Sequence, residues 1–262
     1  MVVFLYLWVM HLVTLITDFG TKGYRTAALK GALLSACRDI SIVDVSHDIT
    51  PFDIDEAAFI LRSSYAQFPA KTIHLVNVLN YYEMDNRIVY FQQDDQLFIG
   101  PDNGIFSLVF EDLDVPIYSI GNTDDHYTDI CGQIIKGICE GHSPDEIGTE
   151  ITDFRRKLIL QPVTATNEIR GSVIFVDRYG NVIVNIKKTD FDRIRNDRSF
   201  SLYFNRHEHI HEISAHYMQV DIGSPLCSFN SQDYLEIAVN LQRADELLGI
   251  KKGDVIQIKF QD

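Results

Sequence analysis

Apolar residues in the first 160 positions follow two alternating patterns. Short runs of β-branched and aliphatic residues predict five strands, the last two joined as a hairpin around Asp94-Asp95: 13–17, 40–45, 72–78, 88–91 and 96–99. Between the earlier runs and after the hairpin, apolar residues three and four positions apart predict helices within 28–36, 54–68 and 130–138. Strands that alternate with helices predict an α/β fold with a largely parallel sheet.

The pattern changes near Pro162, and strand-like runs dominate the rest of the chain. These runs are 171–176, 182–186, 200–204, 210–214 and 255–260. One short helix is expected near 241–248, where Gly249 is a suitable residue to end it. We therefore expect an N-terminal α/β domain over residues 1–160 and a smaller C-terminal domain over 165–262, built as a β-sandwich or β-barrel-like sheet.

The net charge and the cysteines limit the classes of function and the cellular compartment that the sequence predicts. The 262 residues carry a formal net charge of −14, from 23 basic and 37 acidic residues. Such a chain is a poor partner for nucleic acid, because phosphate binding needs basic patches. The four cysteines, which include no CxxC pair, are Cys37, Cys131, Cys139 and Cys227. Buried free thiols in a cytoplasmic protein are the expected state.

The first residues are strongly apolar, but they do not predict a membrane anchor. The apolar run continues from Val2 into the first strand, has no Lys or Arg before it, and is shorter than the roughly 20 residues that span a bilayer. Met10 starts a cleaner sequence, MHLVTLITDFG. We expect Met10 to be the natural initiator, or residues 1–9 to be a loose extension.

Asp18 follows the first predicted strand directly, in the segment TLITDFG. Ligands of open α/β sheets collect at the carboxyl ends of strands, and a carboxylate there can accept two hydrogen bonds from the vicinal diol of a ribose. The alternative is an aspartate that caps the next helix or shapes a turn. The strand and the aspartate alone leave both interpretations open.

Five short motifs stand in order along the chain: TDFGT, VDVSHDITPF, GPDNG, VDRYGN and YLEIAVN. Together they resemble the S-adenosylmethionine hydrolase (hydroxide adenosyltransferase) and halogenase superfamily, which includes fluorinase and chlorinase. The resemblance extends from Thr14 to about Gly253. It implies an α/β front domain, a β-barrel rear domain, and a homotrimer. In that trimer an adenosyl ligand is held between the front domain of one subunit and the rear domain of its neighbour.

The resemblance also implies roles for individual residues. Asp18 would hold the ribose hydroxyls, and Phe52 would pack beside the ribose. Asn181, with the backbone near Val239 and Leu241, would read the adenine edge. The remaining expected ligand contacts are stacking by Tyr179 and Tyr217, and binding of the methionine end by Asp177 and Ser231. Plain core packing is the alternative for both tyrosines.

The reaction implied is attack of water or hydroxide on the ribose C5′ of S-adenosylmethionine, which releases adenosine and L-methionine without a cofactor or a metal. Such a step gains mainly from in-line alignment in a dry pocket. The family's hydrolases place an aspartate after the third strand, an arginine seven positions later, and a histidine in a later loop. An ungapped count puts Leu79, Asn86 and His126 at these positions.

The sequence thus keeps only His126 as a catalytic candidate, and a surface loop histidine is its alternative. Arg87 lies one position from the missing arginine, and Glu83 or Asp85 could supply the missing carboxylate. Gly23 replaces a carboxylate that the family often has near the methionine amine. Tyr127 occupies the place of the halide-contacting serine of fluorinase, which argues against a halogenase. A non-catalytic binder or sensor of an adenosyl ligand is the alternative function.

The segment HEHIHE places His207, His209 and His211 at a spacing of two residues. Three imidazoles on one strand face could hold a metal ion. Direct neighbours along a straight strand point apart, so we expect a solvated strand face or hairpin and no metal site.

Overall fold

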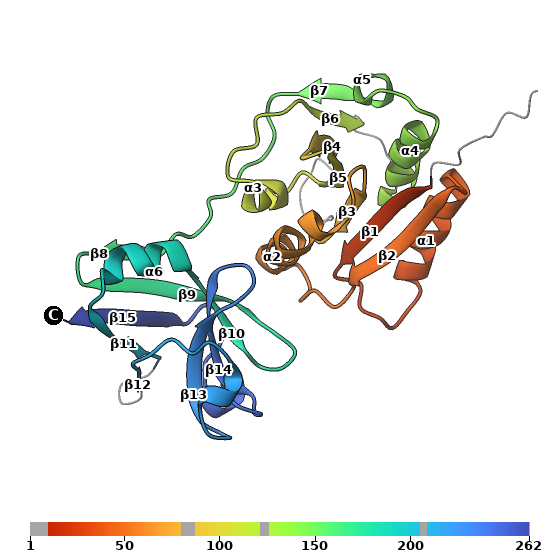
Figure 1. Ribbon diagram of the computed structural model, residues 1–262. Helices are drawn as coiled ribbons and strands as arrows, with labels where there is room; N and C mark the ends of the chain where they lie inside the picture. The colour runs from red at the N-terminus through yellow and green to blue at the C-terminus, as the bar shows by residue number, and fades with distance from the viewer. Residues whose placement is uncertain (1–9, 80–86, 121–125, 205–208, 262) are drawn as a thin grey trace, which may run out of the picture. The chain divides into compact units, whose positions relative to one another are not determined.

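The computed structural model describes residues 10–79, 87–120, 126–204 and 209–261 (Figure 1). The chain forms two compact units, which we call unit 1 (Met1–Ile159) and unit 2 (Leu160–Asp262). The expectations for residues 1–9 and for Glu83, Asp85, Asn86 and His207 lie outside the described residues.

Unit 1 is built on a mixed, mostly parallel sheet. Its strands are β1 (His11–Thr17), β2 (Ile40–Ser46), β3 (Ile73–Asn77), β4 (Ile88–Gln93), β5 (Gln96–Pro101), β6 (Ile117–Ile120) and β7 (Thr149–Ile151). They lie in the order β2-β1-β3-β5-β4-β6-β7. The first four of this order are parallel, and β4, β6 and β7 add antiparallel pairs. The predicted α/β class and the hairpin of β4 with β5 are confirmed.

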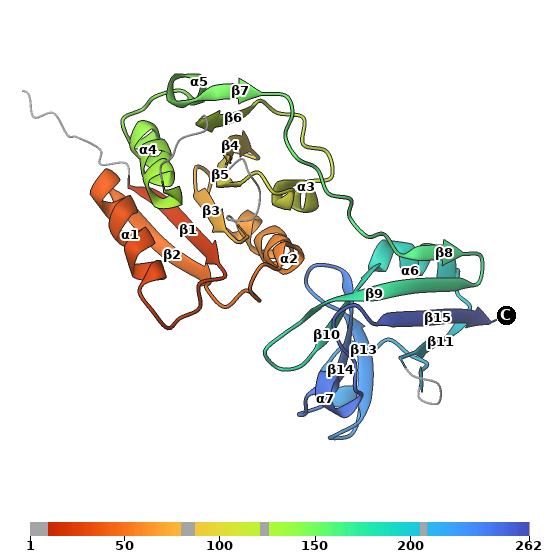
Figure 2. The same cartoon turned by 180° about the vertical axis from the view of Figure 1, so that it is seen from behind.

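Helices cover both faces of this sheet (Figures 1 and 2). They are α1 (Arg25–Ala36), α2 (Ile54–Ser64) with the 3-10 turn η1 (Tyr65–Gln67), α3 (Ile105–Val109), α4 (Tyr127–Cys139) and α5 (Pro144–Ile147). Successive residues of β3 face opposite sides. Leu75 packs in one core with Leu29 of α1 and Ile134 of α4, whereas Val76 packs in the other core with Leu61 of α2. Both faces of β3 are therefore buried, which explains its unbroken apolar run.

The strand order reverses direction at β1. β1 leads through α1 to β2 on one side, and β2 leads through α2 to β3 on the other side of β1. In open α/β sheets, a crevice forms at such a reversal, outside the carboxyl ends of the strands. The ends of β1 and β3, next to Asp18 and Leu79, lie at this point.

Unit 2 contains a nearly closed, barrel-like antiparallel sheet. Its strands are β8 (Val163–Ala165), β9 (Glu168–Val176), β10 (Val182–Lys187), β11 (Ser199–Tyr203), β12 (His209–Ile210), β13 (Pro225–Phe229), β14 (Tyr234–Val239) and β15 (Val255–Gln261). They run β12-β11-β15-β9-β10-β14-β13, with β8 paired to β9. A bridge between Ile213 and Cys227 links the two ends of this path. The sequence did not decide between a β-sandwich and a β-barrel-like sheet for this unit, and the structure shows the barrel-like form.

Short helices in unit 2 differ from the sequence expectation. They are α6 (Lys188–Arg195), the 3-10 turn η2 (Tyr217–Gln219) and α7 (Ala244–Leu247). The helix expected near 241–248 is only the single turn α7. The strand expected at 210–214 was wrong for most of its length, because β12 ends at Ile210.

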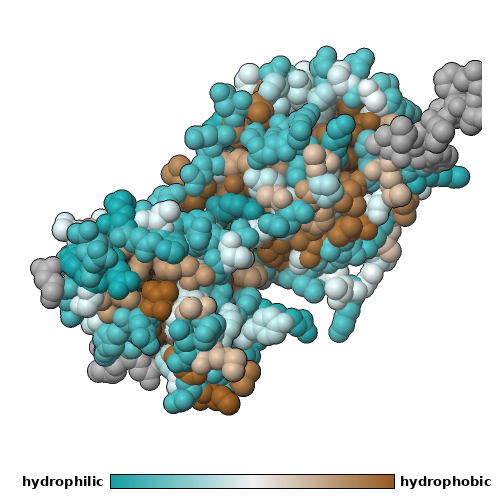
Figure 3. Space-filling model, in the orientation of Figure 1, coloured by the Kyte–Doolittle hydropathy of each residue, from teal (hydrophilic) through white to brown (hydrophobic). Residues whose placement is uncertain are grey.

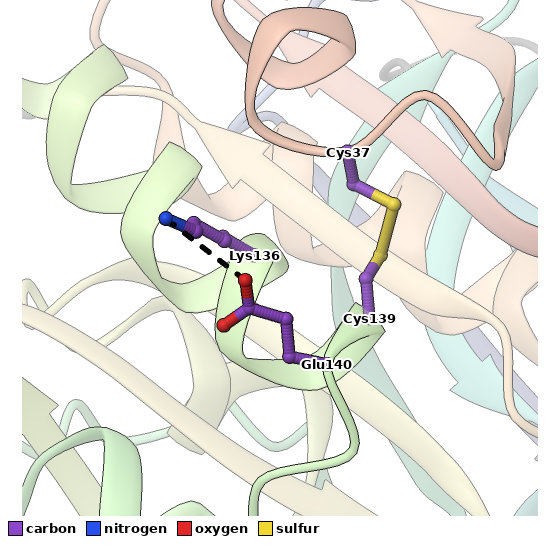
Figure 4. The surroundings of a disulfide bond; sticks show 4 residues. All are labelled: Cys37, Lys136, Cys139 and Glu140. Carbon is purple, nitrogen blue, oxygen red and sulfur yellow. Dashed lines mark ion pairs between the residues drawn. A yellow bond between two sulfur atoms is a disulfide. The ribbon is translucent and has the colours of Figure 1, made fainter.

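A disulfide joins Cys37 to Cys139, with their Cα atoms 6.5 Å apart and a sequence separation of 102 (Figure 4). The expectation of four free thiols was therefore wrong for this pair. Cys37 follows α1 and Cys139 ends α4, and these two helices pack on the same face of the sheet, so their carboxyl-terminal ends meet. Cys131 and Cys227 are buried free thiols, as expected.

The surface fits the acidic composition. Hydrophilic residues cover much of the face shown in Figure 3, and hydrophobic residues form patches among them. None of the helices in the described part of the chain is long and apolar enough to cross a membrane.

Candidate functional site

Asp18 joins two loops at the carboxyl edge of the unit 1 sheet. Its Oδ2 accepts a hydrogen bond from the backbone N–H of Phe52, at 3.0 Å, across the gap between the loop after β1 and the loop after β2. Helix α1 begins only at Arg25, with Tyr24 as its N-cap residue, so Asp18 does not cap it. Within the described residues, Oδ1 of Asp18 has no hydrogen-bond partner. The carboxylate therefore offers one oxygen to a ligand at the strand reversal.

Phe52 is held in an unusual backbone conformation. Its φ is +70°, in the left-handed region that bulky residues avoid, and the residue is 58% exposed. The next residue, Asp53, caps α2 by accepting the N–H of Glu56 at 3.0 Å. The cap and the bond to Asp18 fix the backbone of Phe52 from both sides, and the residue remains largely exposed.

The end of β3 carries no carboxylate among the described residues. Leu79 has a φ of +50°, and the carbonyl groups of Val78 and Leu79 accept the side-chain amide of Asn103, at 2.9 and 3.1 Å. Asn77, the last residue of β3, is 2% exposed, and its Oδ1 has no partner among the described residues. The GPDNG turn thus supports the end of β3 through Asn103.

Arg87 is already occupied by two carboxylates. Its guanidinium pairs with Asp102, through Nε at 2.9 Å and through Nη2, and with Asp153 at 2.8 Å. The side chain of Asp102 is 2% exposed and also accepts the N–H of Arg155 at 2.9 Å. Arg87 therefore anchors the GPDNG turn.

His126 stands at the start of α4, close to the same sheet edge. Its carbonyl oxygen accepts the N–H groups of Asp129 and Ile130, at 2.9 and 3.2 Å, while its side chain is exposed. The neighbouring Tyr127 donates its hydroxyl to the carbonyl of Val76 in β3, at 2.6 Å. Burial raises the pKa of the Tyr127 phenol well above its ordinary value, so this group stays a neutral donor. The bond ties His126 to the carboxyl end of β3.

In unit 2, Asp177 shapes the VDRYGN turn. Its Oδ1 accepts the N–H groups of Tyr179 and Asn181, both at 2.8 Å, and its Oδ2 accepts the side-chain amide of Asn181 at 3.0 Å. Gly180 has a φ of +81°, and a Cβ there would lie 2.4 Å from Asp245. The turn therefore requires glycine and holds Asn181, which is 9% exposed, in one orientation.

The apolar residues expected to contact the ligand lie at the surface of unit 2. Tyr179 is 78% exposed, Leu241 80% and Tyr217 44%, so core packing was the wrong alternative for Tyr179. Val239 is buried at the end of β14, and Ser231 is exposed in the turn before it.

Scans and searches against known proteins give the same family for both units. Residues 13–148 match the N-terminal domain of SAM hydroxide adenosyltransferases, and residues 171–257 match their C-terminal domain. The chain belongs to this family. The expectation drawn from the five motifs is thereby confirmed.

Named relatives and a solved structure match most of the chain. A protein named (R)-S-adenosyl-L-methionine hydrolase from Methanocaldococcus jannaschii is 28% identical, over 96% of this chain and 97% of its own. One of that name from Thermus thermophilus is 24% identical, over 95% and 100%. A fluorinase from Actinoplanes is 22% identical, over 70% and 74%. The crystal structure of an uncharacterised Thermotoga maritima protein has a TM-score of 0.82 at 27% identity, and the match covers 95% of this chain and 99% of that one.

Two residues of the family motifs have contacts that sequence reasoning missed. Glu236 of the YLEIAVN motif is 7% exposed, and its Oε1 accepts the hydroxyl of Tyr217 at 2.6 Å. Burial raises the pKa of Glu236. The sequence feature that could have identified Glu236 is a single carboxylate within an otherwise apolar strand. His47 of the VDVSHDITPF motif is also buried, and its Nδ1 lies 2.9 Å from Oγ1 of Thr17.

His209 and His211 come together, contrary to the expectation that they diverge. Their rings meet edge to face, with centroids 4.4 Å apart, and Nδ1 of His211 lies 3.1 Å from Oγ of Ser201. The reason is that β12 ends at Ile210, so His211 is no longer on a straight strand. In the parts of the chain that the structure describes, no group of three His, Cys, Asp or Glu side chains could hold a metal ion.

Proposed function

We propose that this protein hydrolyses S-adenosylmethionine to adenosine and L-methionine. The observation that carries the proposal is Asp18. It is a carboxylate with one unpartnered oxygen at the strand reversal, next to an exposed aromatic ring, in a chain of the SAM hydroxide adenosyltransferase family. Relatives named (R)-S-adenosyl-L-methionine hydrolase match over nearly their whole length.

The binding roles divide between the two units. Asp18 accepts hydrogen bonds from the ribose hydroxyls, and Phe52 packs beside the sugar. The residues of unit 2 that complete the adenosyl site are Asp177, Tyr179, Asn181, Tyr217, Ser231, Val239 and Leu241. Asp177 acts partly through Asn181, since both of its oxygens already accept bonds from its own turn.

The reaction is a displacement at C5′ of the ribose. Water or hydroxide forms the new C–O bond while the C–S bond breaks and its electron pair leaves with the sulfur, so that neutral methionine departs. No cofactor is needed. His126 is the proposed base for the attacking water, and its exposed ring and place beside β3 support this role. With Leu79 in place of a carboxylate, no described residue at the end of β3 supplies a carboxylate that would orient the ring, and slow turnover is the expected result.

A second candidate is an adenosyl-ligand binder without turnover. It is favoured by the two departures at the reacting end, namely the apolar Leu79 and an Arg87 that pairs with Asp102 and Asp153.

A homotrimer with the ligand at its subunit interfaces belongs to the proposal and is supported by family membership. A cytoplasmic location belongs to it as well, because S-adenosylmethionine is an intracellular metabolite. The thiol argument for that location no longer applies to Cys37 and Cys139. Cell fractionation would test it.

Incubation with S-adenosylmethionine, with adenosine followed by chromatography, tests the function. We expect adenosine and methionine in equal amounts, and loss of ligand binding in Asp18→Asn. His126→Ala should abolish turnover but leave binding in place, whereas His142→Ala, which removes an exposed histidine beyond the end of α4, should change neither. Saturable binding without adenosine would establish the binder. Absence of both binding and turnover would refute the proposal.

A further inference from the structure

A chain of four polar side chains in contact lies behind Asp18 and has no role in the function proposed above. Nδ1 of His47 lies 2.9 Å from Oγ1 of Thr17, and Nε2 of His47 lies 3.0 Å from Oδ1 of Asp44. The other oxygen of Asp44 accepts the ammonium group of Lys30 at 2.6 Å. Thr17 is 0% exposed and His47 is 8% exposed, so the contact between them is shielded from water, whereas the side chains of Asp44 and Lys30 are partly exposed.

The direction of each bond follows from the chemistry of the groups. An ionised carboxylate carries no proton, so Nε2 of His47, which faces Asp44 at 3.0 Å, is the ring nitrogen expected to carry the proton. In the neutral ring Nδ1 then accepts, and the hydroxyl of Thr17 must donate to it. The Thr17 oxygen is thereby turned toward the N–H of Phe19, which donates to it at 3.3 Å.

The same order of hydroxyl, imidazole and carboxylate occurs in catalytic triads. Thr17 cannot act as a nucleophile here, because it is fully buried in β1 and no substrate can reach it. The chain of bonds must therefore act through its neighbours.

Those neighbours enclose Asp18. Thr17 precedes it and Phe19 follows it, and both take part in the same set of bonds. The carbonyl oxygen of His47 also accepts the N–H of Gly20 at 2.7 Å. Three hydrogen bonds thus join the end of β1 and the loop after it to the segment after β2. They link Asp18 with Phe52, Thr17 with His47, and Gly20 with the carbonyl of His47.

We propose that His47, oriented by Asp44, is a positioning residue that fixes the Asp18 carboxylate for the 2′- and 3′-hydroxyls of the ribose. The inference rests on the proposed function, since it assigns the origin of ribose selectivity within that same site. His47 touches no ligand and acts only through Thr17, Phe19 and Gly20.

The test compares adenosine with 2′,3′-dideoxyadenosine, which lacks both hydroxyls, by calorimetric titration. The wild-type protein should bind adenosine more tightly. Thr17→Val removes only the hydroxyl and should weaken adenosine binding about tenfold, while 2′,3′-dideoxyadenosine binding changes less than about twofold. Thr17→Ser keeps the hydroxyl and should restore the preference.

Two variants of His47 separate its two contacts. His47→Asn places an amide oxygen near the position of Nδ1 and keeps the acceptor for Thr17. His47→Gln places an amide nitrogen near the position of Nε2 and keeps only the contact with Asp44. We expect His47→Asn to retain more of the preference for adenosine than His47→Gln does.

Thr14 supplies a matched control in the same strand. Its hydroxyl bonds Nδ1 of the buried His74 at 2.7 Å, three residues from Thr17 and away from Asp18. Thr14→Val should lower the urea concentration of half-unfolding and leave the ratio of the two affinities unchanged. If Thr17→Val fails to fold, His47→Gln provides the same comparison.

The outcomes separate the two proposals. Equal affinity of the wild-type protein for both nucleosides would refute the ribose contact of Asp18 and the proposed function with it. A wild-type preference that persists in folded Thr17→Val and His47→Gln would overturn the role of His47 and leave the proposed function intact.

Discussion

At the scale of single residues, Phe52 shows backbone strain beside the proposed ligand. A bulky residue at a φ of +70° is less stable by about 1 kcal/mol or more than the same residue in an ordinary conformation. The strain persists because Asp18 accepts the N–H of Phe52 and Asp53 caps α2 immediately afterwards. The result is a largely exposed phenylalanine whose backbone is tied to the carboxylate.

Phe52→Gly should therefore separate binding from stability. Glycine adopts the positive φ without strain but loses more entropy on folding, and the two effects nearly cancel, so we expect a change in unfolding free energy within about 0.5 kcal/mol. Adenosine affinity, measured by titration, should fall because the ring is gone. Lys71→Gly, at a φ of +65° before β3, is the matched control and should leave affinity unchanged. Equal affinity in Phe52→Gly would contradict a ligand contact.

The sequence identified Asp18 and Phe52 as candidates but could not show whether Asp18 caps the next helix. That question depends on where α1 begins, and two glycines in the loop, Gly20 and Gly23, allow the chain to delay the helix until Arg25, which excludes the cap. The bond from Phe52 to Asp18 spans 34 residues, and no local pattern encodes it.

At the scale of elements, β3 carries a histidine in the middle of a buried sheet. Nε2 of His74 donates to the Gln96 oxygen at 2.5 Å, so Nδ1 accepts the Thr14 hydroxyl at 2.7 Å, and the ring lies stacked on Phe98. Burial lowers the pKa of His74 to about 4. The sheet therefore holds a neutral imidazole near pH 7.

This histidine predicts a loss of stability in acid. Its folded pKa lies below the unfolded value of 6.5, so its contribution is complete above pH 6.5 and is lost as the pH falls toward 4. The difference corresponds to about 3 kcal/mol. Urea unfolding at pH 7 and at pH 4.5 should show a smaller difference in His74→Gln than in the wild type. His142→Gln, at an exposed histidine, should keep the wild-type difference.

The disulfide between the ends of α1 and α4 predicts redox-dependent stability. Closing a loop of about 100 residues restricts the unfolded chain and stabilises the fold by roughly 2–4 kcal/mol. A reductant should lower the urea midpoint of the wild type and leave that of a Cys37→Ser/Cys139→Ser double variant unchanged. Cys131→Ser, which removes a buried thiol outside the bridge, should keep the response to reductant. An identical wild-type midpoint with and without reductant would contradict the prediction.

Periodicity predicted the main elements of unit 1 because their buried faces are long and regular. It missed α6, where only Phe191 and Ile194 are buried and the other residues of the helix are polar. It missed the cysteine pair because the contact joins two helices that are far apart in sequence. In both cases tertiary packing supplies what the local pattern lacks.

At the scale of the whole molecule, two units of different architecture each carry part of the proposed binding set. Asp18 and Phe52 belong to unit 1, and Asn181 and Tyr179 belong to unit 2. The order of the five motifs predicted both units and the family. The sequence did not predict that Arg87 would pair with Asp102 and Asp153, because these carboxylates lie 15 and 66 residues away and no local pattern links them to Arg87.

The proposed homotrimer makes a prediction at this scale. Sedimentation analysis should give a mass about three times the 30.0 kDa of one chain. Each chain carries a formal charge of −14, and like charges on neighbouring subunits repel one another over about 10 Å at 0.1 M salt and over longer distances at lower salt. The trimer should therefore be less stable in 10 mM salt than in 200 mM salt, and the protein concentration needed to keep it assembled should be higher in 10 mM salt. Ligand held between subunits would reverse part of this weakening, so adenosine should lower the concentration at which trimers form. A single-chain mass at all concentrations, with adenosine still bound, would refute the shared site and place the whole ligand within one chain.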